Sequence, residues 1–167
     1  HQNWEFIFEC PNLEEINLDQ PSKEQVQAIY KLTNLKRLRI KNFRTKNIEF
    51  VNTLFNVEEL ALEYVSGFSD LSPLQNLLKL KSLHLENLRK VGNFDGLRGI
   101  KTLKYLHIDG PLDWKQPIEN FSFLEEVPEL EILSLMNIVS KTPFPAFLPV
   151  LKLKNLLEIR IPMQILD

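Results

Sequence analysis

An apolar frame of the form Leu-x-x-Leu-x-Leu recurs seven times along this chain of 167 residues, and it limits the possible folds more than any other feature. All 21 anchor positions hold Leu, Ile or Val, and the first anchors are separated by 22, 22, 23, 23, 27 and 26 residues. A near-constant period in this range predicts a stack of similar structural units. The anchors are Leu13/Ile16/Leu18, Leu35/Leu38/Ile40, Val57/Leu60/Leu62, Leu80/Leu83/Leu85, Leu103/Leu106/Ile108, Leu130/Leu133/Leu135 and Leu156/Ile159/Ile161.

Each frame predicts one short β-strand. Successive side chains of a strand point to opposite faces, so the fourth and sixth frame positions face inward and the third, fifth and seventh face outward. A single strand of this kind cannot bury its apolar side, and each unit must therefore stack on the next. We expect one parallel sheet of about seven strands, with the rest of each unit returning over the opposite side.

The return segments differ in their helix signals. The segment Ser22–Gln25 has the residues of a capping box, and Ser72, followed by a proline, fits the N-cap of a later helix. Residues 93–100 predict only a weak helix because they contain two glycines, whereas residues 117–127 predict the best helix after the first. Three prolines within residues 143–149 disfavour a helix and predict an extended turn.

From about Pro11 to Pro162 the chain resembles the leucine-rich repeat proteins, with periods like those of short intracellular-type or bacterial repeats. The resemblance implies an α/β fold, a right-handed solenoid or horseshoe with a concave parallel sheet and short helices or turns on the convex side. Members of this family usually serve as protein-binding surfaces. Their usual Asn at the ninth frame position is absent here, and Asn42, Asn87 and Asn137 stand at the eighth. We therefore expect irregular turns sealed by apolar side chains, and we assign no subfamily.

Composition indicates a single domain spanning residues 1–167. The chain has 20 basic and 22 acidic residues, a balance that excludes a strongly basic nucleic-acid-binding arm. No apolar run approaches the length of about 18 residues that membrane insertion requires. Cys10, the single cysteine, excludes an internal disulfide, is expected to be buried, and fits a reducing, cytoplasmic compartment. Because the chain opens at His1 without Met, we expect it to be a fragment of a longer chain.

The outward frame positions become columns across the predicted sheet, because matching residues of neighbouring parallel strands lie about 4.8 Å apart. The outward residues of the N-terminal strands are mostly charged, and those of the C-terminal strands are more apolar. Strand by strand, the outward residues are Glu15, Asn17, Asp19; Arg37, Arg39, Lys41; Glu59, Ala61, Glu63; Ser82, His84, Glu86; Tyr105, His107, Asp109; Ile132, Ser134, Met136; and Glu158, Arg160, Pro162.

The outward residues of the C-terminal strands form the centre of a predicted binding site. Tyr105, Ile132 and Met136 have no folding reason to point outward, and aromatic and Met residues are typical of interface centres. Scattered exposed apolar residues are nevertheless normal, which leaves a non-functional explanation open. Around this centre the prediction places His107 and Asp109, then His84 and Glu86, and then a charged rim of Arg37, Arg39, Lys41, Glu59 and Glu63.

The charged rim has two interpretations. Arg37 stands between Glu15 and Glu59, and Lys41 between Asp19 and Glu63, so these residues could simply form cross-strand ion pairs on a solvated surface. Alternatively, the rim steers a partner and sets its register. Nucleic acid fits poorly, since only three bases face four acids and no basic stripe continues.

His84 and His107 occupy the same column, with Glu86 and Asp109 beside them, and such a group could hold zinc or make a pH-sensitive contact. Side chains of adjacent strands stand parallel, which argues against the metal, and we predict neither a metal nor another cofactor. Trp114, in the loop after the fifth strand, is expected to pack over the core.

We therefore predict a non-catalytic module that binds a protein partner on its concave face. The sequence has no phosphate-binding glycine loop, no His-Glu-x-x-His and no Gly-x-Ser-x-Gly. Two alternatives are the recognition domain of a larger regulatory protein or enzyme and a bacterial immunity-type or inhibitor protein. A metal-dependent hydrolase centred on His84 and His107 is the least favoured alternative.

Overall fold

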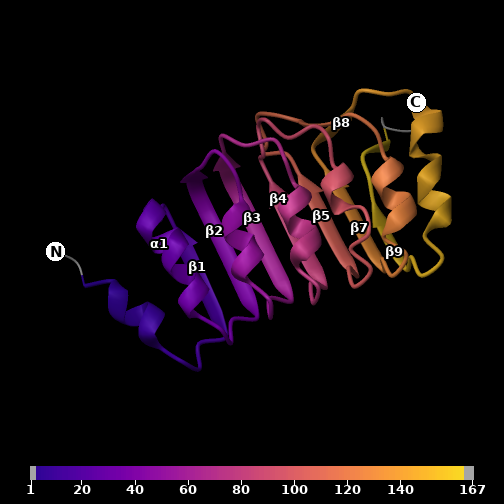
Figure 1. Cartoon of the computed structure of the whole chain (residues 1–167). Helices are drawn as coiled ribbons and strands as arrows, with labels where there is room; N and C mark the ends of the chain where they lie inside the picture. The colour runs from indigo at the N-terminus through magenta and orange to yellow at the C-terminus, as the bar shows by residue number, and fades with distance from the viewer. Residues whose placement is uncertain (1–2, 164–167) are drawn as a thin grey trace.

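Seven parallel strands form one continuous sheet, in the order β1, β2, β3, β4, β5, β7, β9 (Figure 1). The computed structural model describes residues 3–163. One strand comes from each apolar frame, as predicted, and a second sheet pairs the two short strands β6 and β8 in parallel. The strands are β1 Glu15–Asp19, β2 Arg37–Arg44, β3 Glu59–Ser66, β4 Ser82–Glu86, β5 Tyr105–Asp109, β6 Gln116–Ile118, β7 Ile132–Met136, β8 Ile138–Ser140 and β9 Glu158–Arg160.

The register of the large sheet follows the sequence frame without a slip. Third-position residues pair with third-position residues across the whole sheet, as the predicted columns require. This column runs through Glu15, Arg37, Glu59, Ser82, Tyr105, Ile132 and Glu158. A shift of one residue would turn every buried side chain of a strand to solvent, which explains why the register is fixed so firmly.

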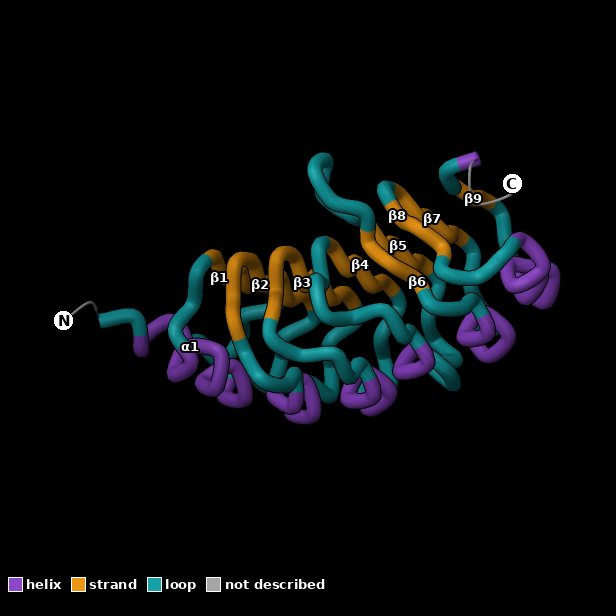
Figure 2. Tube along the Cα trace, turned by 90° about the horizontal axis from the view of Figure 1, so that it is seen from above, coloured by secondary structure: helices purple, strands orange, loops and turns teal. Residues whose placement is uncertain are grey.

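Helical turns cover the opposite side, so that strands line the concave side of a curved body and helices its convex side (Figure 2). Only α1, Lys23–Ala28, is an α-helix within residues 3–163, and it begins with the predicted capping box of Ser22 and Gln25. None of the helices in this part of the chain is long and apolar enough to cross a membrane. The 3₁₀ helices are η1 Glu5–Glu9, η2 Ile29–Lys31, η3 Glu49–Thr53, η4 Ser72–Asn76, η5 Asp95–Leu97, η6 Ser122–Glu126 and η7 Phe144–Lys152.

Three predictions for the return segments are wrong. Residues 117–127 do not form one helix, because Pro117 lies in β6 and only η6 is helical. Residues 143–149, predicted to be extended, lie mostly in η7, where a proline is accepted in the first turn because no hydrogen bond from its nitrogen is needed there. Ser72 is the first residue of η4 and not its cap, and its backbone N–H instead donates to the side chain of Asp70 at 2.8 Å.

Stacking of the units buries the inward positions. The side chains of Leu106 and Leu133, on inner strands, are fully buried, while Ile159 at the same position of the edge strand β9 is 41% exposed. Each inner unit is therefore covered by its neighbours on both sides, as nearest-neighbour stacking requires. Cys10 was predicted to be buried but is exposed, with its thiol 3.6 Å from the carbonyl oxygen of Phe6, because it precedes the first strand.

Five of the turns that follow the strands share one backbone conformation, whereas Gly110, at the eighth position of the fifth frame, has no positive φ. The prediction of irregular turns is therefore wrong for these five turns and holds for the fifth frame. The eighth frame position has a positive φ, between 47° and 55°, at Gln20, Asn42, Tyr64, Asn87 and Asn137. Asn tolerates this left-handed region better than most residues, which explains its repeated occurrence there. The predicted apolar seal is confirmed: the ninth-position residues Phe43, Val65, Leu88 and Ile138 are buried.

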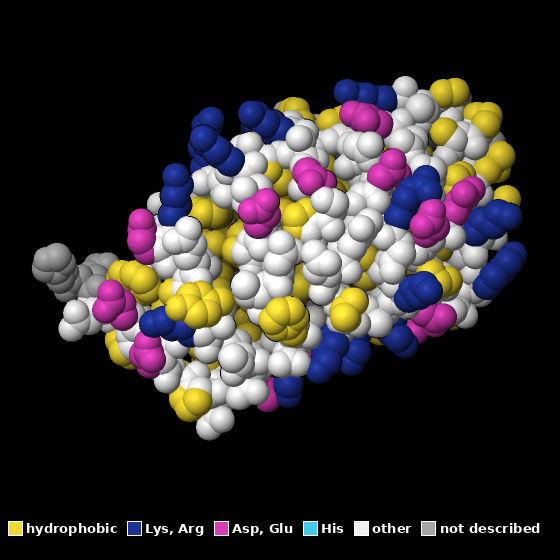
Figure 3. Space-filling model, in the orientation of Figure 1, with side chains coloured by type: hydrophobic (Ala, Val, Ile, Leu, Met, Phe, Trp, Pro, Cys, Tyr) yellow, Lys and Arg dark blue, Asp and Glu magenta, His cyan; other side chains and the backbone are white. Residues whose placement is uncertain are grey.

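Figure 3 shows the convex face, on which charged side chains are scattered and no histidine is visible. Hydrophobic atoms gather at the end of the molecule that η7 occupies, where Leu148 and Leu151 are exposed. The two histidines of the predicted site, His84 and His107, lie instead on strands β4 and β5, at positions that face the concave side. The histidines of the predicted site therefore lie on the concave face and not on the face that Figure 3 shows.

Candidate functional site

The outward residues of β5 and β7 form the apolar part of the concave face. Tyr105 and Ile132 are register partners, and the Tyr105 side chain is 36% exposed while Ile132 is half-buried. Met136, at the far end of β7, is 46% exposed. The partly buried His107 and the buried Ser134 lie between these two ends. We call Tyr105, Ile132 and Met136 the apolar patch.

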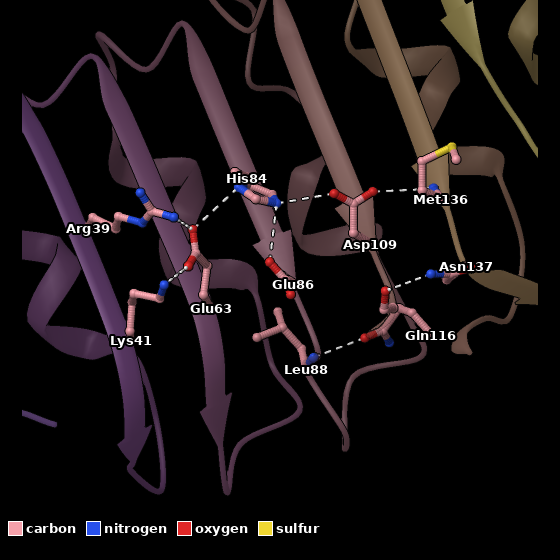
Figure 4. Close-up of polar contacts among 11 residues, drawn as sticks. Arg39, Lys41, Glu63, His84, Glu86, Leu88, Asp109, Gln116, Met136 and Asn137 are labelled. Carbon is pink, nitrogen blue, oxygen red and sulfur yellow. Dashed lines mark hydrogen bonds and ion pairs between the residues drawn. The ribbon is translucent and has the colours of Figure 1, made fainter. Parts of the chain in front are cut away.

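Glu63 is the centre of a charged cluster on the neighbouring strands (Figure 4). Its side chain is only 2% exposed, although its strand position faces outward. The Arg39 Nη2 atom lies 2.6 Å from Glu63 Oε1, and Lys41 Nζ lies 3.1 Å from Oε2. Two long basic side chains from β2 and the His84 ring from β4 surround this carboxylate, which buries it.

His84 joins this cluster to the acidic residues of β4 and β5 (Figure 4). Its Nδ1 lies 3.6 Å from Glu63 Oε1, and its Nε2 lies 3.2 Å from Asp109 Oδ2 and 3.9 Å from Glu86 Oε2. The hydrogen bond with Asp109, together with the negative charges of Glu63 and Glu86, raises the pKa of His84 above its ordinary value. Both ring nitrogens face carboxylates, so the doubly protonated imidazolium fits this position best.

His107 has the opposite electrostatic environment. Its ring centroid lies 5.8 Å from that of His84, with the rings edge to face. Burial and the neighbouring His84 lower the pKa of His107 below its ordinary value. Within residues 3–163, no group of three or more His, Cys, Asp and Glu side chains is arranged to hold a metal ion. The nitrogens of His84 point to carboxylates instead of converging with His107 on a common point.

The remaining rim residues form cross-strand ion pairs in part. Arg37 Nε lies 2.8 Å from Glu15 Oε2, while the second predicted neighbour of Lys41, Asp19, instead accepts a hydrogen bond from the Asn42 side chain at 2.7 Å. A second row of pairs lies one position earlier in the frame, at the edge of the concave face. It consists of Lys36–Glu14, Lys81–Glu58 and Lys104–Glu131, each at 2.7 Å. Exposed pairs of this type contribute between about 0 and 1 kcal/mol each.

The sequence reasoning missed Gln116, whose side chain joins β6 to the segment that follows β4. Its side chain is buried, with Oε1 accepting from the Leu88 N–H at 3.0 Å and Nε2 donating to the Val91 carbonyl at 2.6 Å. The signal was the longer 27-residue spacing of this repeat, which makes room for β6. Trp114, in the loop before β6, is half-buried and stacks with the Arg89 guanidinium, 5.6 Å from the ring centroid, so its predicted packing over the core is wrong.

Asp109 is held by the strand beside it as well as by His84. Its Oδ1 accepts a hydrogen bond from the Met136 N–H at 3.3 Å, and Asn137 Nδ2 donates to the Gly110 carbonyl at 3.3 Å (Figure 4). The Asp109 carboxylate therefore bridges β4 and β7 from β5. Of the predicted site residues, the structure brings together Arg39, Lys41, Glu63, His84, Glu86, His107 and Asp109, while Arg37 and Glu59 lie apart at the other end of their strands.

The sequence matches no protein-family profile and no curated protein sequence. Among solved structures, the internalin InlF from Listeria monocytogenes is 24% identical, with 93% of this chain and 42% of that chain covered and a TM-score of 0.71. Internalin C2 from the same species is 22% identical, covering 96% of this chain and 66% of that one, with a TM-score of 0.73.

The PEPR1–AtPEP1 structure is also similar, at 18% identity and a TM-score of 0.59, with 93% of this chain and 25% of that chain covered. This chain thus spans less than two thirds of the length of each of these three proteins. The parallel sheet, the repeat register and these structural likenesses agree: the chain has the leucine-rich repeat fold.

Proposed function

We propose that this chain is a protein-binding module that takes its partner on the concave face, with the apolar patch at the centre of the contact. One observation carries the proposal: Tyr105 and Met136 are exposed at outward strand positions, Tyr105 beside the partly exposed Ile132 and Met136 at the other end of the same strand as Ile132. Removing apolar side chains of this size from water stabilises a complex, and exposed apolar side chains gathered on one face are typical of interaction sites.

The structure supports this role in a second way. The concave face is built on the hydrogen-bonded strands of one sheet, so its side chains stand in fixed columns. A preorganised surface loses little conformational entropy when a partner binds. The partly buried Arg37 and the exposed Glu59 at the N-terminal end provide charges that accelerate encounter and select the register of the partner.

A capture experiment tests the proposal. The immobilised chain is incubated with a lysate of its native source, in parallel with a Tyr105→Asp/Ile132→Asp double variant and a Phe55→Asp control. Phe55 is 70% exposed and lies between η3 and β3, outside the concave columns, so the control also replaces an exposed apolar residue by an acid. Circular dichroism establishes that all three proteins are folded before they are compared.

The proposal predicts that at least one protein is retained by the wild type and by Phe55→Asp and is lost from the double variant. Mass spectrometry then identifies that protein, and the purified pair gives the affinity. Equal retention by all three proteins would move the contact away from β5 and β7. Specific retention by none of them would remove the support for a binding module.

A further inference from the structure

The C-terminal edge of the large sheet is open. Strand β9 pairs with β7 on one side and, within residues 3–163, with no strand on the other (Figure 1). Ile159, at the fourth frame position of β9, is 41% exposed, whereas Ile16, at the same position of the opposite edge strand β1, is only 8% exposed. An unpaired strand edge that also exposes an apolar side chain favours the addition of another strand.

The residues along this edge complement themselves when they are read in reverse. Residues 157–161 are Leu, Glu, Ile, Arg and Ile. If two such segments pair antiparallel about a two-fold axis at Ile159, this residue faces its own copy and Leu157 faces Ile161. Glu158 of each copy then faces Arg160 of the other. Side chains alternate between the two sides of a strand, so the apolar pairs lie on the core side and the charged pairs on the concave side.

The two charged residues of β9 are available for this contact. Arg160 Nε donates to Glu158 Oε1 at 2.6 Å, and within residues 3–163 neither side chain has a second ion-pair partner. Their side chains are 58% and 42% exposed. A second copy would place the opposite charge beside each of them, giving four charges of alternating sign. Opposite charges directly across an antiparallel pair stabilise it, and like charges destabilise it.

Leu157 departs from the row of frame positions to which it belongs. It stands at the second position of the last frame and is 83% exposed. Exposed apolar residues that gather at one end of a molecule are typical of interaction sites. The second position is charged in each of the six other frames, which have Glu14, Lys36, Glu58, Lys81, Lys104 and Glu131 there.

The charges favour this two-fold contact over a head-to-tail contact between copies. In a head-to-tail arrangement, β1 of one copy would add to β9 of the other in the parallel register of the sheet. Glu158 would then face Glu15, and Arg160 would face the uncharged Asn17. Two acids directly opposite each other oppose such pairing, and a head-to-tail contact that does not close also adds further copies without limit.

We infer that two copies of this chain associate by antiparallel pairing of their β9 strands, so that their two seven-stranded sheets continue into each other. The contact uses the edge of the sheet and leaves its concave face open, so the inference goes beyond the proposed function. Because the contact is confined to one end of the solenoid, the dimer is weak and its population depends on protein concentration.

Analytical ultracentrifugation of the 167-residue chain tests the inference. We expect the average mass to rise with concentration from 19.6 kDa toward twice that value and no further. Glu158→Arg leaves only basic side chains at the charged positions of the contact, and Arg160→Glu leaves only acidic ones. Each variant alone should therefore remain a monomer, whereas an equal mixture of the two should form the dimer again. Glu49→Arg, a charge reversal at an exposed position of η3, should behave like the wild type.

Disulfide formation tests the position of the two-fold axis. In a Cys10→Ser background, which removes the exposed native thiol, Ile159→Cys should cross-link two chains. Residue 159 faces its own copy at a Cα separation of about 4.5–5.5 Å, which a disulfide can span. Leu157→Cys should cross-link much more slowly, although Leu157 is the more exposed residue, because it faces Ile161 of the other copy.

Four results would overturn the inference. They are a monomer at all concentrations up to the millimolar range, masses that grow beyond two chains, dimers of either charge variant alone, and faster cross-linking at residue 157 than at residue 159. Circular dichroism establishes that each variant is folded. The equal mixture guards against a trivial loss of association, since two damaged proteins would not recover the dimer when they are combined.

Discussion

Replacing Gln116 by Ala should destabilise the whole solenoid, because this buried side chain satisfies backbone groups of the preceding repeat. The substitution leaves the Leu88 N–H and the Val91 carbonyl, now bonded at 3.0 and 2.6 Å, without their partners. An unsatisfied buried polar group costs about 1–3 kcal/mol, so two such groups lower the free energy of unfolding by about 3 kcal/mol. A change of that size lowers the Tm by roughly 6–12 °C for a chain of this length.

Urea denaturation followed by circular dichroism measures this effect. We expect the midpoint to fall while the m-value stays constant, since the native surface is hardly changed. Gln75→Ala is the matched control: Gln75 is exposed in η4, and its replacement should change the free energy of unfolding by less than about 0.5 kcal/mol. A Gln116→Ala variant as stable as Gln75→Ala would refute the claim that this side chain joins the two repeats.

Three further predictions concern the core, the turns and the histidines. Leu106→Ala, at a fully buried position, should lower the free energy of unfolding by about 3 kcal/mol in the same denaturation assay. Gly110→Ala should lower the free energy of unfolding more than Gly99→Ala does, because a Cβ at Gly110 would lie 2.2 Å from a backbone oxygen of the facing turn. A Cβ at Gly99 meets no atom within 4 Å, so only its positive φ opposes the substitution. Equal losses of stability in the two variants would contradict this prediction. His84, whose folded pKa is raised, adds stability that is complete below about pH 6.5 and is lost as the pH rises through the folded pKa. His107, whose folded pKa is lowered, loses its stabilising contribution as the pH falls below about 6.5. Stability measured against pH should therefore lose its alkaline decline in His84→Gln and its acid decline in His107→Gln, and unchanged profiles would refute both assignments.

The large sheet could be predicted residue by residue because a single physical constraint fixes it. The fourth and sixth frame positions must be buried, and a shift of one residue would expose them all. The predicted pairing of Tyr105 with Ile132, and of His84 with His107, therefore appears unchanged in the structure. The exposed side of each strand follows from the same alternation.

The convex side could not be predicted from local propensity. Its helices are mostly short 3₁₀ turns, whose positions depend on stacking against the neighbouring repeat more than on the intrinsic preferences of their residues. The prolines of η7 illustrate this, since they would disfavour a long α-helix but are accommodated in this segment. Pro117 likewise lies in β6, a strand of the two-stranded sheet, where a proline is tolerated because no third strand needs its nitrogen.

The strand register confirms the predicted columns, but the side-chain contacts within them were not predicted. The frame places Glu63 and His84 on neighbouring strands at different heights, and only the conformations of their long side chains bring Nδ1 and Oε1 to 3.6 Å. The burial of Glu63 beneath Arg39 and Lys41 has the same origin. Alternation of residues along a strand carries no information on these conformations. For Gln116 the sequence offered only the 27-residue spacing of its repeat, since the residue type by itself is an ordinary polar one.

The most direct test of the concave face as the binding surface is hydrogen–deuterium exchange of the chain with and without its captured partner. We expect exchange to slow in the peptides that contain β4, β5 and β7, because a bound partner covers Tyr105, Ile132 and Met136. The convex segments that contain η3 and η4 should exchange at the same rate in both samples. Slower exchange confined to those convex segments, with β5 and β7 unaffected, would contradict the central claim.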